Sequence, residues 1–156
     1  MPDASFQAPD LSGKAAVVTG ASRGIGKAIA VGLGKAGCGV VVAAKSEKDR
    51  DHLPGTIHDT CEEIEVAGGR AVPIRTDVRD EAAVEAMVGA AADSFGQLDI
   101  LVNNAGALWW KPIEETPPRR FDLVVGVNVR AAFLASHFAL PVMKEQGFGL
   151  VINIAP

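Results

Sequence analysis

Short apolar runs alternate along the chain with longer stretches in which apolar residues recur every three or four positions. The apolar runs cover residues 15–18, 39–44, 71–75, 98–102 and 150–154. Runs of this length and composition are typical of strands that a sheet buries on both faces. Pro73 cannot donate to a sheet ladder, so we expect the third strand to lie at an edge or to be irregular.

Helices are predicted between these runs, over residues 25–36, 57–67, 80–95 and 117–146. Gly37 is a suitable residue to close the first of them, and Asp80 is a suitable N-cap for the third. Thr116 followed by Pro117 predicts a cap and a first helical position for the fourth. We expect this last helix in two pieces, interrupted near Gly126.

Strands that alternate with helices indicate β-α-β units with right-handed crossovers. The expected fold class is α/β, with a doubly wound parallel sheet between two helical layers, cut short after the fifth strand. We expect a single domain over residues 1–156, in which the polar residues 1–12 form a loose arm.

The composition and charge of the chain exclude several classes of protein. The 156 residues are 48% hydrophobic and 22% charged, as in an ordinary folded domain, and the formal net charge is −4. An acidic chain has no basic stripe for phosphates, which argues against nucleic-acid binding. No apolar run approaches the roughly 20 residues that span a bilayer, and the N-terminus lacks a secretory signal pattern. Cys38 and Cys61 lack metal or redox spacing, so we expect no metal site and a reducing, cytoplasmic location.

Residues 19–26 read TGASRGIG and lie between the first predicted strand and the first predicted helix. Glycines let a backbone approach phosphates closely, and the next helix offers free N–H groups at its N-terminus. This context favours a pyrophosphate site over a plain glycine-rich turn. The expected contacts come from Gly20, Ala21, Ser22, Arg23, Gly24, Ile25 and Gly26. A Walker A loop is excluded, because Ala28 stands where that loop needs a hydroxyl residue.

The end of the second predicted strand bears on which dinucleotide binds. Ala44 stands where an NAD-type site places an acid for the ribose hydroxyls, and Lys45 follows it. Lys45 and Arg23 offer two cations to a single 2′-phosphate, which favours NADP(H) over NAD(H). The alternative is that Lys45 is a solvated lysine in the charged loop 45–54.

Residues 19–26, Asp77, the NNAG run at 103–106 and Asn128 resemble, in this order, the short-chain dehydrogenase/reductase family. The resemblance implies a Rossmann-type fold and hydride transfer between a nicotinamide and a carbonyl or alcohol substrate. It assigns Asn128 to a catalytic Asn-Ser-Tyr-Lys set. It assigns to the cofactor Asp77, Val78, Asn104, Ala105 and Gly106, with Asp77 at the adenine amine. The segments 43–46, 53–57, 61–65 and 77–81 resemble, more particularly, the hydroxysteroid-dehydrogenase-like branch.

Each assignment has a plainer alternative. The two asparagines of the NNAG run could cap a strand end, Asp77 could be an ordinary turn acid, and Asn128 could point to solvent. Trp109 and Trp110 follow the NNAG run, and they either line a substrate pocket or close a loop over apolar surface.

The family's chemistry requires a tyrosine and a lysine four residues later, and this chain contains no tyrosine. The family also places a serine beyond the fifth strand, where Pro156 stands with Ala155 before it. We therefore expect the chain alone to be inactive. Three hypotheses stay open: the cofactor-binding part of an NADP(H) oxidoreductase, a nucleotide-binding module without chemistry, and a different Rossmann-like enzyme. Steroid, fatty acyl and simple carbonyl substrates are equally open.

The last predicted helix also bears on assembly. Phe133, Leu134, His137, Phe138 and Val142 occupy more of its circumference than one packing face needs. In the resembled family the corresponding helix commonly builds a dimer interface, so we expect a homo-oligomer. The alternative is that one subunit buries both faces.

Overall fold

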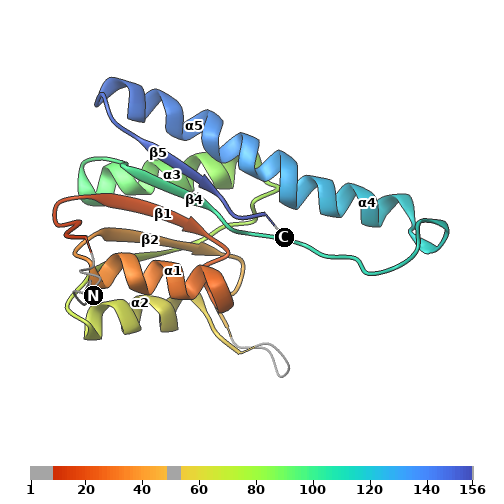
Figure 1. Cartoon of the computed structure of the whole chain (residues 1–156), viewed down its shortest axis with the longest axis horizontal. Helices are drawn as coiled ribbons and strands as arrows, with labels where there is room; N and C mark the ends of the chain where they lie inside the picture. The colour runs from red at the N-terminus through yellow and green to blue at the C-terminus, as the bar shows by residue number, and fades with distance from the viewer. Residues whose placement is uncertain (1–8, 49–53, 156) are drawn as a thin grey trace, which may run out of the picture.

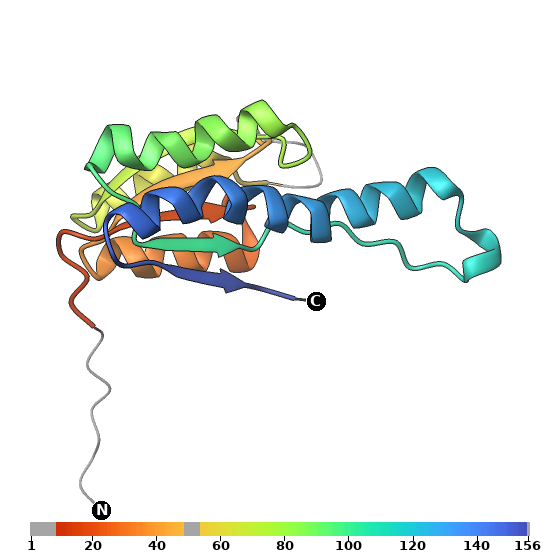
Figure 2. The same ribbon diagram turned by 90° about the horizontal axis from the view of Figure 1, so that it is seen from above.

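The computed structural model describes residues 9–48 and 54–155 (Figures 1 and 2). Its centre is a five-stranded sheet in the order β3-β2-β1-β4-β5, and every neighbouring pair is parallel. The strands are β1 (Ala15–Thr19), β2 (Gly39–Ala44), β3 (Arg70–Arg75), β4 (Ile100–Asn103) and β5 (Leu150–Asn153). The predicted α/β class and doubly wound parallel sheet are confirmed.

Helices cover both faces of the sheet. One layer consists of α1 (Gly24–Lys35) and α2 (Ile57–Val66), and the other of α3 (Glu81–Phe95) and α5 (Ala131–Glu145). Alternate residues of the strands point to opposite layers: Val17 and Val41 pack with α3 and α5, whereas Val18 and Val40 pack with α1 and α2. β1, β2 and β4 are buried on both faces, and their sequences read as continuous apolar runs, whereas the outer strands β3 and β5 are partly exposed.

The sequence also predicts the place of the third strand in the sheet and the looseness of the N-terminal arm. β3 pairs only with β2 among the described strands, so Pro73 lies on an edge strand as predicted. The N-terminal arm is less loose than expected where it is described: Leu11 donates its N–H to the carbonyl of Ala36 at 2.7 Å and packs on the α1–α2 layer. Residues 1–8, 49–53 and 156 lie outside the described part of the chain.

The long helix starts one residue later than its sequence predicts. Pro117 is the N-cap of α4 (Pro118–Val125), and Thr116 does not cap it. A residue before proline is driven into extended backbone, so Pro117, with ψ of 144°, cannot take the first helical position ahead of Pro118. The Thr116 hydroxyl instead donates to the carbonyl of Pro112 at 2.9 Å, across the short turn η1 (Ile113–Glu115).

The predicted interruption near Gly126 is a π-helical turn, η2 (Gly126–Arg130), inside one continuous helix of 28 residues, Pro118–Glu145. By length and composition this helix could cross a membrane, contrary to the expectation that no segment is long enough. Helices that cover the sheet of an α/β fold can have the same length and composition. Here Leu134, Ala139 and Met143 are buried in the core cluster that α5 shares with α3 and the sheet.

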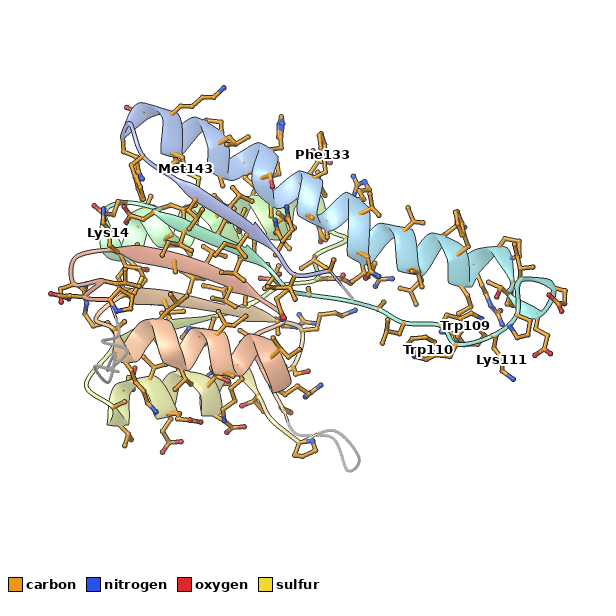
Figure 3. All side chains as sticks on the ribbon, in the orientation of Figure 1. Lys14, Trp109, Trp110, Lys111, Phe133 and Met143 are labelled. Carbon is orange, nitrogen blue, oxygen red and sulfur yellow. The ribbon has the colours of Figure 1, made fainter. Side chains whose placement is uncertain are left out.

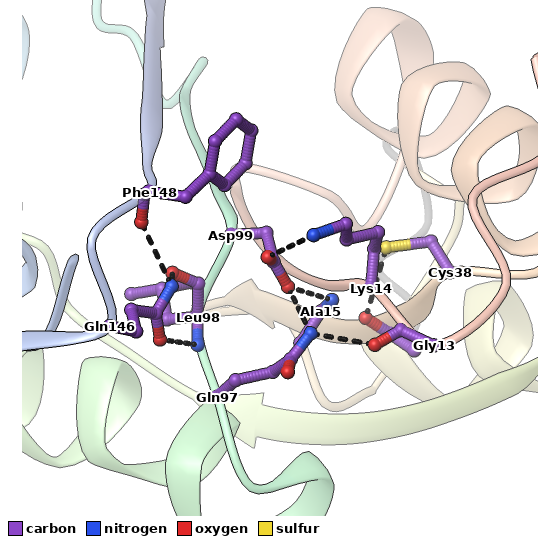
Figure 4. Close-up of polar contacts among 10 residues, drawn as sticks. Gly13, Lys14, Ala15, Cys38, Gln97, Leu98, Asp99, Gln146 and Phe148 are labelled. Carbon is purple, nitrogen blue, oxygen red and sulfur yellow. Dashed lines mark hydrogen bonds and ion pairs between the residues drawn. The ribbon is translucent and has the colours of Figure 1, made fainter.

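A buried carboxylate connects the N-terminal ends of the strands (Figure 4). Asp99 is 3% exposed, and it accepts hydrogen bonds from the backbone N–H of Ala15 and the ammonium of Lys14, both at 2.9 Å. Gln97 donates to Asp99 and to the carbonyl of Gly13. Gln146 bridges to both backbone groups of the neighbouring residue Leu98. With the backbone N–H of Leu150, which the Asp99 carbonyl accepts at 2.8 Å, these bonds join the starts of β1, β4 and β5. The site lies at the opposite end of the strands.

Candidate functional site

The strands β1 and β4 end side by side, and the hydroxyl of Thr19 joins them. It accepts the backbone N–H of Asn104 at 2.9 Å and that of Ala105 at 3.0 Å, and it donates to the carbonyl of Val102 at 3.3 Å. Thr19 is 3% exposed, so these bonds are shielded from water. The sequence pattern placed Thr19 only at the head of the glycine loop, since a buried hydroxyl in a strand has no distinctive spacing.

The glycine loop lies against this junction at van der Waals distance. The Asn104 side-chain amide donates to the carbonyl of Thr19 at 2.9 Å and to that of Gly20 at 3.4 Å. A Cβ on Gly26 would lie 2.4 Å from both the Asn104 Nδ2 and the Gly20 carbonyl oxygen. Gly20 has a φ of +67°, which disfavours any side chain there. Only glycine at positions 20 and 26 allows the loop, α1 and β4 to converge.

Elements behind the loop hold its shape. Ala21 donates its N–H to the carbonyl of Ala43 at 3.1 Å and accepts the Thr60 hydroxyl at 2.9 Å. Gly55 lies so close to the loop that a Cβ there would be 2.6 Å from the carbonyl oxygen of Ser22. The conformation of residues 20–26 is therefore fixed by β2 and α2 as well as by β1 and β4.

The N-terminus of α1 differs from those of α2 and α3. α2 has a capping box formed by Thr56 and Asp59, and Asp80 caps α3 through the N–H groups of Ala82 and Ala83. No side chain caps α1, and its first turn has no acidic residue. Its first N–H groups and its positive dipole end can therefore receive an anion such as a pyrophosphate.

The two cations predicted at a 2′-phosphate lie on either side of the end of β2, and each has a partner of its own. The Arg23 guanidinium donates to the carbonyls of Pro54 and Gly55 at 3.1 and 2.7 Å and to the Ser46 hydroxyl at 3.1 Å. Lys45 is ion-paired with Asp77, with 2.9 Å between Nζ and Oδ2. The structure does not aim both cations at one point, because Arg23 is bonded to two backbone carbonyls and a hydroxyl and Lys45 to a carboxylate.

Asp77 is the most heavily contacted acid of the site. Arg79 donates to it from Nε at 3.0 Å, from Nη2 at 2.7 Å and from its backbone N–H at 3.1 Å. These bonds from Arg79, and then the contact with Lys45, hold the pKa of the Asp77 carboxyl far below its usual value. Asp77 is thus a fixed anion, and its bond to the N–H two residues on is that of an Asx-turn, as in the turn-acid alternative.

A cavity of about 310 Å³ lies between the glycine loop, the end of β2 and the segment after β3. It brings together many of the residues that the sequence assigns to a cofactor: Gly20, Lys45, Asp77, Val78, Ala105 and Gly106 are all in its lining. Ala44 lines it too and adds no charge, as expected of a site that tolerates a 2′-phosphate. Ala21, Ser22, Arg23, Gly24, Ile25 and Gly26 do not line it, and Ile25 is exposed at the start of α1.

Asn128 lies in the π-helical turn η2, and both ends of its side-chain amide bond to one residue. Its Oδ1 accepts the N–H of Ala107 at 2.8 Å, and its Nδ2 donates to the carbonyl of Ala107 at 3.0 Å. It does not point to solvent, and it acts here as a positioning residue that ties the NNAG run to the long helix. It also lines a second cavity of about 410 Å³, together with Asn103, Asn153 and Ala155.

The other singled-out residues lie apart from this cluster. Trp109 and Trp110 lie on the segment that extends beyond the end of the sheet (Figure 3), and neither lines either cavity. Arg120 of α4 lies over the Trp109 ring, 4.4 Å from its centroid, whereas Trp110 is 84% exposed. Cys38 and Cys61 are free thiols, and burial raises their pKa values to about 11 and about 12.

Comparison with known proteins agrees with this geometry. Residues 14–156 match the family model described as short chain dehydrogenase. Hydroxysteroid dehydrogenase-like protein 2 of Homo sapiens and that of Xenopus tropicalis are each 45% identical over 146 residues, which are 94% of this chain and 35% of theirs. The chain thus spans about a third of the length of these relatives. Both the family and the branch that the motifs resemble are confirmed.

Solved structures give the same answer. A putative dehydrogenase from Xanthomonas campestris superposes with a TM-score of 0.90 at 42% identity, covering 95% of this chain and 55% of that one. A metagenomic short-chain oxidoreductase solved in complex with NADP superposes with a TM-score of 0.82 at 38% identity, covering 94% of this chain and 63% of that one.

The contact at Gly26 can be tested against a glycine in the same helix. Gly26→Ala would force a methyl group into the Gly20 carbonyl, so we expect a loss of about 1–3 kcal/mol in the free energy of unfolding. Gly32→Ala is the matched control, because a Cβ there has nothing within 4 Å. It should leave the protein as stable or stabilise it by up to about 1 kcal/mol, through the better helix propensity of alanine. Urea unfolding followed by circular dichroism measures both, and equal shifts would contradict the account.

Proposed function

This chain belongs to the short-chain dehydrogenase family, and we propose that it forms the cofactor-binding part of an oxidoreductase that uses NADP(H). The observation that carries the proposal is the glycine-only contact between Gly26, Gly20 and Asn104, which builds a close-fitting backbone cradle at the N-terminus of an uncapped helix. A backbone this close to free N–H groups at a helix N-terminus is suited to bind a phosphate.

The residues of the site fit a dinucleotide from one end to the other. The backbone of residues 20–26 and the first turn of α1 would hold the pyrophosphate, and Asp77 and Val78 would hold the adenine. Asn104, Ala105 and Gly106 would support the nicotinamide side, where Asn128 fixes the adjoining backbone. When bound, the dinucleotide supplies or accepts the hydride that interconverts a carbonyl and an alcohol. The NADP complex of the metagenomic relative supports this choice of cofactor.

The preference for NADP(H) over NAD(H) is tested at the end of β2. In Ala44→Asp/Lys45→Ala an added carboxylate would repel the 2′-phosphate, and a cation that contacts it would be lost. Since a charge-assisted contact contributes roughly 1.5–3 kcal/mol, we expect NADPH affinity to fall by at least about tenfold. NADH affinity should stay the same or rise, because the new carboxylate stands where an NAD-type site binds the ribose hydroxyls. Titration calorimetry measures both, with Lys48→Ala as the control that removes a nearby charge. Equal NADPH and NADH affinities in the unaltered protein would refute the preference.

The second candidate function is a nucleotide-binding module without chemistry, and the absence of tyrosine from the 156 residues favours it. Both candidates predict that this chain binds NADPH yet reduces no carbonyl compound, because no positioned proton donor is present. General acid catalysis typically contributes 10²–10⁴-fold. A carbonyl panel assayed by nicotinamide absorbance, with a complete short-chain dehydrogenase as the reference, should show a deficit of at least about 100-fold. Comparable rates would contradict both candidates.

The native mass separates the two candidates. A polypeptide in its native source with a mass near 16.2 kDa would favour the binding module. A longer polypeptide that contains this sequence would favour the oxidoreductase, because the relatives are about three times as long.

We further propose that the complete protein is a homo-oligomer through the outer face of the long helix. Val129, Phe133 and Leu140 lie along that face and are 63%, 66% and 43% exposed, whereas Leu134 is buried within the subunit. Light scattering at micromolar concentration should give at least a dimer. Phe133→Glu should weaken it, and Val66→Glu, at an exposed site on α2, should not. A monomer at this concentration would rule out the proposal.

A further inference from the structure

We infer that Lys45 is shared between two anions, Asp77 in the free protein and the 2′-phosphate in the complex, so that Asp77 and Arg79 help to set the preference for NADP(H). The inference rests on the proposed function and deepens it. Lys45, Asp77 and Arg79 all line the cavity of about 310 Å³ beside the glycine loop, so one ligand can meet all three.

The hydrogen bonds of Asp77 show why an exchange is needed. Its Oδ1 accepts the backbone N–H and Nε of Arg79, and its Oδ2 accepts Arg79 Nη2 and Lys45 Nζ. A carboxylate offers about four acceptor positions, and these four bonds fill them. An adenine amine that binds Asp77 must therefore displace one of the present donors.

Lys45 is the donor that can leave. It makes one contact with Asp77, and its side chain is 53% exposed, so water readily replaces that bond. Arg79 makes three contacts from a residue only two positions away. Its backbone is held in addition, because its carbonyl accepts Arg130 Nη1 at 3.1 Å.

The departure of Lys45 has two effects at once. It frees an acceptor position on Asp77 for the adenine, and it frees an ammonium group beside Ala44 for a 2′-phosphate. NAD(H) has no such phosphate, so Lys45 gains nothing when NAD(H) displaces it. Among the described residues, the nearby acid Glu47 is ion-paired with Arg75 and Glu81 with Arg130, and Asp77 is the acid that pairs with Lys45.

Arg79 moderates this competition. While its guanidinium pairs with Asp77, the carboxylate attracts Lys45 less strongly and repels the 2′-phosphate less. The depressed pKa of Asp77 keeps the carboxylate ionised across neutral pH, so the competition persists there. Arg79 is thus a specificity-determining residue that acts through Asp77.

A double-mutant cycle tests the exchange. The measured quantity is the ratio of the NADH dissociation constant to the NADPH dissociation constant, by titration calorimetry at low salt. Asp77→Asn keeps a carbonyl oxygen for the adenine amine and releases Lys45, so we expect the ratio to rise about three- to tenfold. In a Lys45→Gln background the same substitution should raise the ratio by less than half as much, because only the direct repulsion between Asp77 and the 2′-phosphate is then removed. Glu47→Gln is the control, because it removes a carboxylate from the same segment that does not contact Lys45.

Arg79→Gln supplies an independent arm. Asp77 then has Lys45 as its only cationic partner, so the ratio should fall about two- to fivefold, and this fall should disappear in Asp77→Asn. Circular dichroism of each variant checks that the fold is retained.

Other outcomes overturn the inference in distinguishable ways. An equal rise with and without Lys45 would show simple charge repulsion by Asp77, and the exchange would be wrong. A ratio that does not change in Asp77→Asn would also refute the exchange, while NADPH binding would leave the proposed function intact. If the folded protein binds neither dinucleotide, the proposed function and the inference both fail.

Discussion

The close approach of three backbone segments at Gly20, Gly26 and Asn104 is the constraint on which the rest of the site depends. β1 and β4 end next to each other, and α1 starts so near to them that a Cβ on Gly26 would lie 2.4 Å from its neighbours. This proximity places Gly20, the second half of the NNAG run and the end of β2 around one cavity, with the uncapped N-terminus of α1 following directly in the chain. A larger residue at either glycine would separate these parts.

The N-terminal and C-terminal ends of the parallel strands have different roles. At the end where the strands begin, the buried Asp99 carboxylate is satisfied by Lys14, Ala15 and Gln97, and the backbone of Asp99 bonds to β1 and β5 (Figure 4). At the C-terminal ends of the strands, the charged side chains of Lys45, Asp77 and Arg79 line a cavity and are partly exposed. A ligand can therefore reach charged groups at the end where the strands finish.

The sequence predicts the frame of this protein well, because local patterns determine it. The run at 39–44 becomes β2 without change of bounds, and Pro73 lies on an edge strand as its missing N–H requires. The start of α4 is missed by one residue, since the effect of Pro118 on Pro117 outweighs the capping preference of Thr116. The interruption near Gly126 is a change of hydrogen-bond spacing in a continuous helix, which composition does not encode.

The site is predicted less completely, because its polar pairs join distant parts of the chain. The motif order correctly gathers Gly20, Asp77 and Ala105 at one cavity. It does not reveal that Lys45 pairs with Asp77, 32 positions away. It also does not reveal that the Asn128 side chain hydrogen-bonds to the backbone of Ala107. The role of Thr19 is not predicted for the same reason, since its hydroxyl at the end of β1 accepts hydrogen bonds from residues that follow β4.

The most direct test of the central claim is a titration of the ¹⁵N-labelled chain with NADPH, followed by backbone amide chemical shifts. The account predicts that the largest shifts fall in residues 20–26, at Lys45 and Arg79, and in residues 105–107. The amides of Ala15 and Asp99, at the opposite edge, should not move. Shifts centred on that opposite edge or on the outer face of α5, or none at saturating NADPH, would contradict it.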